Sequence, residues 1–123
     1  MKDAPVPGNA LLLVEDDAMV RDAALSVLEE SGFQVFIATH GADALELLRD
    51  GLRPGLILLD WMMPVMNGAE TLAAIQQDPE LAALPLVIFS AAPPEGMAGV
   101  RTIKKPLRMR DLIALVSEYC RPS

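Results

Sequence analysis

Short apolar runs alternate along this chain with segments of helical periodicity. Three of the runs contain no polar position: residues 10–14 (ALLLV), Leu56 to Leu59 and Leu86 to Phe89. Unbroken apolar runs of this length are typical of strands that are buried on both faces of a parallel sheet. Val35 to Ala38 and Val100 to Ile103 show weaker strand patterns, so we predict five strands.

The segments between these runs carry apolar residues at helical spacing. The first helix begins near Asp17, a residue type that caps helix N-termini, and ends at Gly32. A second helix ends near Gly51, a third stops at Pro79, and a further helix lies near the C-terminus. Their apolar positions are, in chain order, Val20, Ala23, Ala24, Val27 and Leu28; Ala44, Leu45 and Leu48; Leu72 and Ile75; and Met109, Leu112, Ile113 and Val116.

Strands that alternate with helices predict βαβ units, and therefore an α/β fold with a parallel sheet. The connection between the fourth and fifth strands is the exception. It contains only AAPPEGMAG (residues 91–99), in which two prolines and two glycines disfavour a full helix. We therefore expect the helix at this position to be shortened or missing.

Length and composition narrow the possible functions. The chain has 123 residues, 52% hydrophobic and 22% charged, as expected of one globular domain. We expect this domain to span residues 10–121, after a flexible tail over residues 1–9. A net charge of −7 disfavours direct binding to nucleic acid or anionic membrane, and a single cysteine excludes an internal disulfide. No stretch has the pattern of a signal peptide or a membrane span, so we expect a cytoplasmic protein.

Polar residues follow four of the five predicted strands. Carboxylates follow the first strand (EDD, residues 15–17) and the third (Asp60), a hydroxyl follows the fourth (Ser90), and lysines follow the fifth (Lys104 and Lys105). In an open parallel sheet the carboxyl ends of the strands are where ligands bind. Clustered carboxylates without histidine or cysteine favour Mg²⁺. With a lysine and a hydroxyl to bind an anion, the set predicts phosphoryl transfer onto an aspartate nucleophile.

Four sequence blocks that contain these residues carry a family resemblance. LLLVEDD, LILLDWMMPVMNG, LVIFSA and IKKPL resemble, in order and spacing, the blocks of the response-regulator receiver domain (CheY-like) of two-component signalling. The resemblance runs from about Leu11 to the last helix. It implies a flavodoxin-like (βα)5 fold, a doubly wound parallel sheet with strand order 2-1-3-4-5.

The resemblance also implies a mode of action. A receiver takes a phosphoryl group from a histidine kinase or a histidine phosphotransfer protein, and signals by contact with a downstream protein. It is a signalling module rather than an enzyme, although it takes part in its own phosphorylation. We expect a monomer or a weak dimer with no direct contact to nucleic acid or membrane. A domain of a larger hybrid kinase is the alternative to a stand-alone protein.

By the same resemblance, four residues form the metal and phosphorylation site. Asp60 is implied as the residue that accepts the phosphoryl group. Magnesium would be bound directly by Asp16 and Asp60, by the backbone carbonyl of Met62, and by Glu15 through a water molecule.

Ser90 and Lys105 are implied as the hydroxyl and the ammonium that contact the phosphoryl group, with a cis bond before Pro106. Two departures from the family pattern bear on signalling. Thr102 stands three positions before the lysine, where the family usually has an aromatic switch residue. Residues 91–104 separate Ser90 from Lys105, about two helical turns fewer than usual. The swing of an aromatic ring therefore cannot operate here in its usual form.

Other interpretations of the same residues stay open. Glu15 and Asp16 alone would suit an ordinary helix start, and Ser90 an ordinary turn. A receiver-like docking module that works without phosphorylation is compatible with Thr102 and with the short connection. An aspartate-nucleophile phosphatase is less favoured, because that class needs a second aspartate where this chain has Met62. A flavin carrier would need a phosphate-binding loop after the first strand.

Some residues outside these blocks also have an expected role. Five of the ten basic residues fall within residues 101–110. We interpret them as local balance for the acidic site, with a docking patch for an acidic partner as the alternative. We expect His40 to be solvated or to cap a helix, Trp61 to be partly exposed beside the site, and Cys120 to be inert.

Met62 and Ala92 lie two positions after Asp60 and Ser90, where receivers often carry polar groups that influence the attacking water. Because apolar side chains cannot orient water by hydrogen bonding, we predict that the phosphorylated chain loses its phosphoryl group slowly. Intact mass spectrometry over time measures the half-life. A half-life shorter than that of receivers with polar residues at both positions would contradict the prediction.

Overall fold

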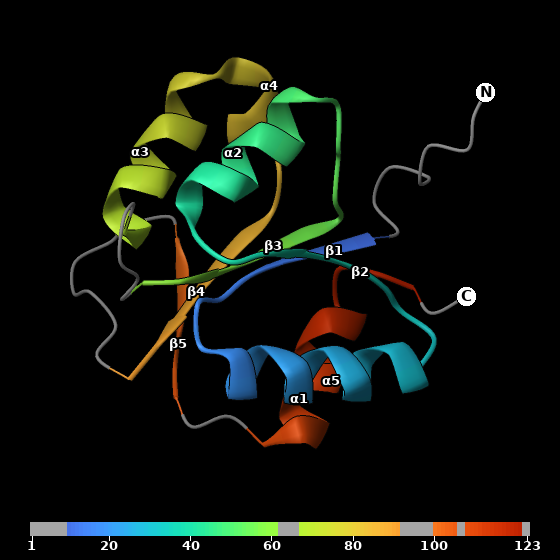
Figure 1. Ribbon diagram of the computed structural model, residues 1–123. Coiled ribbons are helices and arrows are strands. Elements are labelled where there is room, and N and C mark those ends of the chain that lie inside the picture. Colours follow the sequence, from blue (N-terminus) through green and yellow to red (C-terminus); the bar gives the residue numbers. More distant parts are fainter. Residues whose placement is uncertain (1–9, 62–66, 92–99, 106–107, 122–123) are drawn as a thin grey trace.

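A five-stranded, all-parallel sheet in the order β2-β1-β3-β4-β5 forms the centre of the molecule (Figure 1). The computed structural model describes residues 10–61, 67–91, 100–105 and 108–121. The strand order and the parallel direction confirm the predicted flavodoxin-like fold. The strands are β1 (Ala10–Val14), β2 (Gln34–Ala38), β3 (Leu56–Asp60), β4 (Leu86–Ser90) and β5 (Arg101–Lys104).

Helices cover both faces of this sheet (Figure 1). On one face lie α1 (Ala18–Glu30) and α5 (Met109–Ser117). On the other face lie α2 (Gly41–Arg49), α3 (Gly68–Gln77) and the short α4 (Pro79–Ala82). Coverage on both sides explains why the central strands have no polar position: alternate side chains enter two separate apolar layers.

Neighbouring residues of β1 show this division. Leu11 and Leu13 pack in the layer under α1 and α5, where Leu28 is also buried. Leu12 and Val14 pack in the opposite layer under α2 and α3. The strands β1, β3 and β4 contribute side chains to both layers. Packing on both faces therefore holds the C-terminal ends of these strands at fixed positions.

Local sequence signals set the helix ends much as predicted. The Asp17 side chain caps α1 by accepting hydrogen bonds from the backbone N–H groups of Met19 and Val20. His40 caps α2 through Nδ1, which accepts from the N–H of Asp43 at 3.3 Å. Gly32 follows the end of α1 with φ of +92°, a conformation that favours glycine.

The sequence pattern missed α4. Pro79 does end α3, but it also begins a new helical turn, with Asp78 as the cap. A proline suits the first helical position because its missing N–H has no partner there. This α4 precedes β4 and is a different element from the helix expected between β4 and β5. Residues 92–99 of that connection, and the predicted tail of residues 1–9, lie outside the described residues. Within the described ranges, every helix is too short or too polar to cross a bilayer.

The start of α3 lies unusually close to the end of β3. The N–H of Gly68 donates a hydrogen bond to the carbonyl of Trp61, the residue after Asp60, at 3.0 Å. A Cβ atom at position 68 would lie 2.7 Å from both Cα and Cε3 of Trp61. Gly68 therefore allows α3 to contact the backbone that carries the candidate site.

We predict that Gly68→Ala destabilises the chain by about 1–3 kcal/mol, because the backbone of Trp61 cannot yield as a flexible side chain would. Urea denaturation measures the loss, and Trp61 fluorescence reports the local change. Gly51→Ala is the matched control: Gly51 has φ of +113° but no atom within 4 Å of an added Cβ. It should lose stability without changing the Trp61 emission. An unchanged Trp61 spectrum in Gly68→Ala would count against this close contact.

Candidate functional site

The C-terminal ends of β1, β3, β4 and β5 meet at a polar hollow of about 260 Å³, which we call the acidic hollow. The parallel direction of the strands brings these ends to one edge of the sheet, as the sequence analysis predicted. The hollow is lined by Glu15, Asp16, Asp17, Asp60, Ser90, Ala91 and Lys105.

Three carboxylates converge in the acidic hollow. Glu15, Asp16 and Asp60 each offer one oxygen, and these oxygens lie within 4.8 Å of one another. Glu15 and Asp60 are buried, with 1% and 3% of their surface exposed, whereas Asp16 is open to solvent. Like charges this close in a buried site repel strongly, so a proton or a cation is needed among them.

Lys105 supplies one such cation. Its Nζ donates a hydrogen bond to Oε1 of Glu15 at 2.8 Å and to Oδ1 of Asp60 at 3.4 Å. The same nitrogen lies 4.6 Å from the centre of the Phe89 ring. Burial acts to lower the pKa of Lys105, but the hydrogen bond and the charges of Glu15 and Asp60 together raise it. Lys105 is therefore held in its charged form.

Glu15 is fixed in place on all sides. Its backbone N–H continues the sheet by donating to the carbonyl of Ala38 at 3.0 Å. Its Oε1 accepts from Lys105, and its Oε2 accepts from the N–H of Asp17 at 3.1 Å. Arg21 donates to its backbone carbonyl at 3.3 Å. Both carboxylate oxygens of Glu15 are thus already engaged.

The carboxyl group of Asp60 has a raised pKa. Burial, followed by the hydrogen bond and the negative charge of Glu15, raises its pKa to about 7, although the charge of Lys105 opposes the rise. With a pKa of about 7, Asp60 is partly protonated at neutral pH when no cation besides Lys105 lies near it. A divalent cation in the hollow would favour its ionised form.

The remaining predicted residues have these positions. Ser90 is buried at 1% exposure, lines the acidic hollow at the end of β4, and lies one residue beyond Phe89, which pairs with Asp60. Thr102 is half-buried in β5 and pairs with Ile88. Lys104 is exposed, as expected. Met62, Ala92 and Pro106 lie outside the described residues.

Two residues of the site were not anticipated from the sequence. Phe89 supports the Lys105 ammonium with its ring, and Arg21 donates to the backbone carbonyls of Glu15 and Asp16. Arg21 lies one helical turn after Asp17. This spacing could have indicated that its side chain reaches back to the backbone before α1. Phe89 gave no separate signal, because it reads as one more apolar residue of a buried strand.

Comparisons with known proteins agree with this geometry. The sequence model of the family "Response regulator receiver domain" matches residues 11–117. The transcriptional regulatory protein CpxR of Escherichia coli (strain K12) is 34% identical over 122 residues, which cover 94% of this chain and 50% of CpxR. The chain thus spans about half the length of this curated relative.

Solved structures show the same similarity. The receiver domain protein (CheY-like) from Methanospirillum hungatei JF-1 superposes with a TM-score of 0.77 at 34% identity, covering 90% of this chain and 93% of that one. The phosphorylated cyanobacterial phytochrome response regulator RcpA superposes with a TM-score of 0.74 at 29% identity, covering 89% of each chain.

The raised pKa of Asp60 generates a prediction for the chain without divalent cations. Between about pH 4 and pH 7 the folded chain keeps a proton on Asp60 that the unfolded chain has lost, so stability falls as pH rises through this range. This loss of stability is absent below the pKa that Asp60 has in the unfolded chain, and it is complete above the pKa that Asp60 has in the folded chain. Asp60→Asn removes it and should gain on the order of 1–3 kcal/mol over the wild type between about pH 5 and about pH 8.

Urea denaturation in EDTA across this pH range tests the prediction. Asp22→Asn, which alters an exposed carboxylate of α1, is the matched control and should follow the wild type. A difference between Asp60→Asn and the wild type that does not change with pH would refute it.

Proposed function

The chain belongs to the response-regulator receiver domains, which are signalling domains of two-component systems, and on this basis we propose that it accepts a phosphoryl group on Asp60. The donor is a histidine kinase or a histidine phosphotransfer protein. One observation carries the proposal: three carboxylates, two of them buried, meet in the acidic hollow, with the ammonium of Lys105 at 2.8 Å from Glu15 and 3.4 Å from Asp60.

The donor set fits a hard divalent cation such as Mg²⁺. All three side chains offer carboxylate oxygens, within 4.8 Å of one another. Asp16 and Asp60 would bind the ion directly. Glu15 would act through water, since Lys105 and the N–H of Asp17 already occupy its two oxygens. Met62, the proposed carbonyl ligand, lies outside the described residues. When bound, Mg²⁺ would supply positive charge that offsets the carboxylates and the phosphoryl oxygens.

In the proposed transfer, a carboxylate oxygen of Asp60 attacks the phosphorus of a phosphohistidine on the donor. A P–O bond forms as the P–N bond breaks, and the donor imidazole, protonated on its other ring nitrogen, leaves as a neutral ring with the electron pair of that bond. Asp60 becomes an acyl phosphate, and the donor histidine returns to its unmodified form. The attack requires ionised Asp60, which the positive charge of Lys105 favours.

Lys105 and Ser90 act on the phosphoryl group once it is on Asp60. Nζ of Lys105 already contacts Asp60, so a small shift lets it donate to a phosphoryl oxygen instead of Glu15. Ser90 lines the same hollow and offers a hydroxyl donor. These contacts distinguish the phosphorylated from the unmodified chain, and the downstream protein binds the two forms with different affinity.

A docking role without phosphorylation is the second candidate. It is favoured by Thr102, which is half-buried in β5 and cannot act as an aromatic switch. The buried convergence of Glu15, Asp60 and Lys105 weighs against it, because a pure docking module does not need three repelling carboxylates in a hollow.

We predict that a small phosphodonor with Mg²⁺ adds one phosphoryl group to the chain, seen by intact mass. Asp60→Ala should remove the adduct, since it removes the attacking oxygen. Replacing Mg²⁺ with EDTA should reduce the rate at least about tenfold, because the charge of the phosphoryl oxygens is then uncompensated.

Asp22→Ala is the matched control, because it removes an exposed carboxylate of α1 outside the hollow. It should be phosphorylated like the wild type. An adduct that persists in Asp60→Ala would place the modification elsewhere, and no adduct in any variant would favour the docking role.

A further inference from the structure

The side chain of Lys105 has two kinds of neighbour. Its Nζ donates to Oε1 of Glu15 at 2.8 Å and to Oδ1 of Asp60 at 3.4 Å. The same nitrogen lies over the ring of Phe89, 4.6 Å from the ring centre. An aromatic ring has a negative face that attracts an ammonium, and the attraction is stronger where water is partly excluded. Phe89 is therefore a third partner of the Lys105 charge, and an uncharged one.

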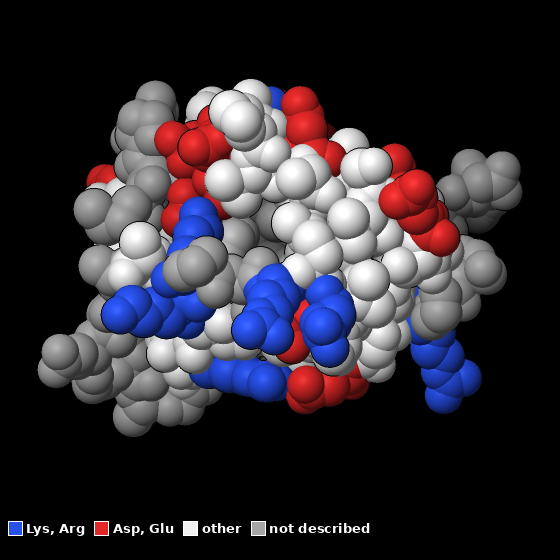
Figure 2. Space-filling view, turned by 90° about the horizontal axis from the view of Figure 1, so that it is seen from below, with Lys and Arg blue, Asp and Glu red and all other residues white. Residues whose placement is uncertain are grey.

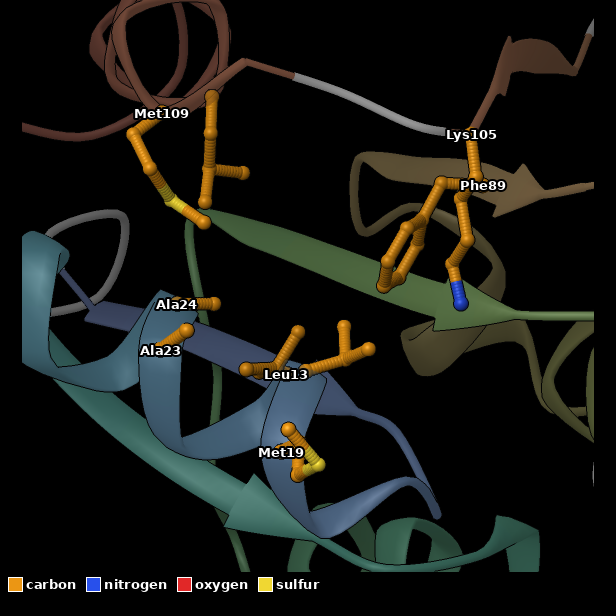
Figure 3. Close-up of a pocket in the computed structure, with 9 residues that line it drawn as sticks. Leu13, Met19, Ala23, Ala24, Phe89, Lys105 and Met109 are labelled. Atoms are coloured by element: carbon orange, nitrogen blue, oxygen red, sulfur yellow. The ribbon is translucent and has the colours of Figure 1, made fainter.

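The ring of Phe89 has a fixed place between the strands of the site. In β4, Phe89 pairs with Asp60 of β3 on one side and with Ile103 of β5 on the other. Only 7% of its surface is exposed, and it packs in the apolar layer under α1 and α5. Figure 3 shows the side chain of Lys105 running alongside this ring. Because the sheet fixes β4, the ring offers the ammonium a fixed point of contact.

Packing alone does not fix the side chain of Lys105. Together with Phe89, Lys105 lines an apolar hollow of about 360 Å³ between α1 and α5. Figure 3 shows Ala23 and Ala24 of α1, with Met109 of α5, around this space. Lysine has a long, flexible stem, and the hollow leaves it room on this side. The position of the ammonium therefore depends on its electrostatic partners.

Positive charge as such is common near this end of the chain. Lys104, Arg108 and Arg110 are exposed to solvent, whereas Lys105 is half-buried. Figure 2 shows the molecule from below, with blue Lys and Arg side chains gathered below the white central part of that face. Lys105 is therefore distinguished by where its charge lies rather than by the charge itself.

Under the proposed function, the ammonium of Lys105 has to change partners. It contacts Glu15 and Asp60 in the unmodified chain, and it donates to a phosphoryl oxygen instead of Glu15 once Asp60 is phosphorylated. An ammonium has three N–H donors, and its attraction to a ring face does not depend on the acceptor that is exchanged. The contact with Phe89 is compatible with both arrangements.

We propose that Phe89 is a positioning residue for phosphoryl transfer. Its ring holds the ammonium of Lys105 beside Asp60 while Glu15 is exchanged for the phosphoryl group. Phe89 acts through Lys105 and takes no part in the bonds that form and break. The inference rests on the proposed function and deepens it, because it makes the electron density of one buried ring a determinant of the rate.

Graded fluorination of this ring tests the proposal. Phenylalanine with one, three or five ring fluorines is incorporated at position 89 of the full chain. Each fluorine draws electron density from the ring face and weakens its attraction for a cation, while the ring stays apolar and nearly the same size. With a small phosphodonor and Mg²⁺, followed by intact mass, we expect the phosphorylation rate to fall stepwise, by about two- to fivefold with five fluorines.

Phe33 provides the matched control. It is 4% exposed and packs in the same layer as Phe89, and within the described ranges no cation lies over its ring. The same fluorinated residues at position 33 should leave the rate unchanged. Phe89→Leu keeps an apolar side chain but removes the ring, so it should slow the reaction relative to Phe33→Leu. Thermal unfolding of each variant shows that it is folded.

The outcomes separate this inference from the proposed function. A wild type without an adduct refutes the proposed function and this inference with it. A wild type that is phosphorylated, with a rate that fluorination at position 89 leaves unchanged, refutes the inference alone. An equal fall in rate at positions 33 and 89 also refutes the inference, because the effect then comes from the apolar core and not from the contact with Lys105.

Discussion

The ammonium of Lys105 between Glu15 and Asp60 is the interaction on which the candidate site depends. It joins residues that are 90 and 45 positions apart in the chain. Asp60 ends β3 and Lys105 follows β5, so β4 lies between them, and two strand spacings amount to about 10 Å. A long side chain can cross this distance, and the Phe89 ring of β4 lies where its ammonium ends. The site therefore requires both the strand order and the length of a lysine.

One ammonium does not neutralise three carboxylates, so the site keeps a net negative charge. In a structural ion pair the partners would be matched and fully satisfied. Here Asp60 keeps a pKa near 7 in spite of Lys105, because burial and Glu15 outweigh it. Under the proposed function, this residual negative charge would attract a divalent cation into the acidic hollow. The cost in stability is the reason why such clusters are found where function requires them.

The sequence was sufficient to predict the parts of the fold that rest on periodicity. Continuous apolar runs identified β1, β3 and β4, because strands covered on both faces admit no polar position. The residues after those runs identified Glu15, Asp60 and Ser90 as neighbours, because a parallel sheet brings the strand ends together. Tertiary contacts were not predictable in this way. The approach of Gly68 to Trp61 and the place of Phe89 under Lys105 arise only when separate segments pack.

The same limit explains why the apolar hollow of about 360 Å³ between α1 and α5, lined by Ala23, Ala24 and Lys105 among others, was not foreseen. Ala23 and Ala24 fit the apolar face of a helix, and a helical pattern does not reveal whether the space beside them is filled. Its position is nevertheless informative, since the side chain of Lys105 lines both this hollow and the acidic one. A change of partner at Nζ would move a side chain that also forms part of the apolar wall. The side chain of Lys105 therefore links the acidic hollow to the surface of α1 and α5.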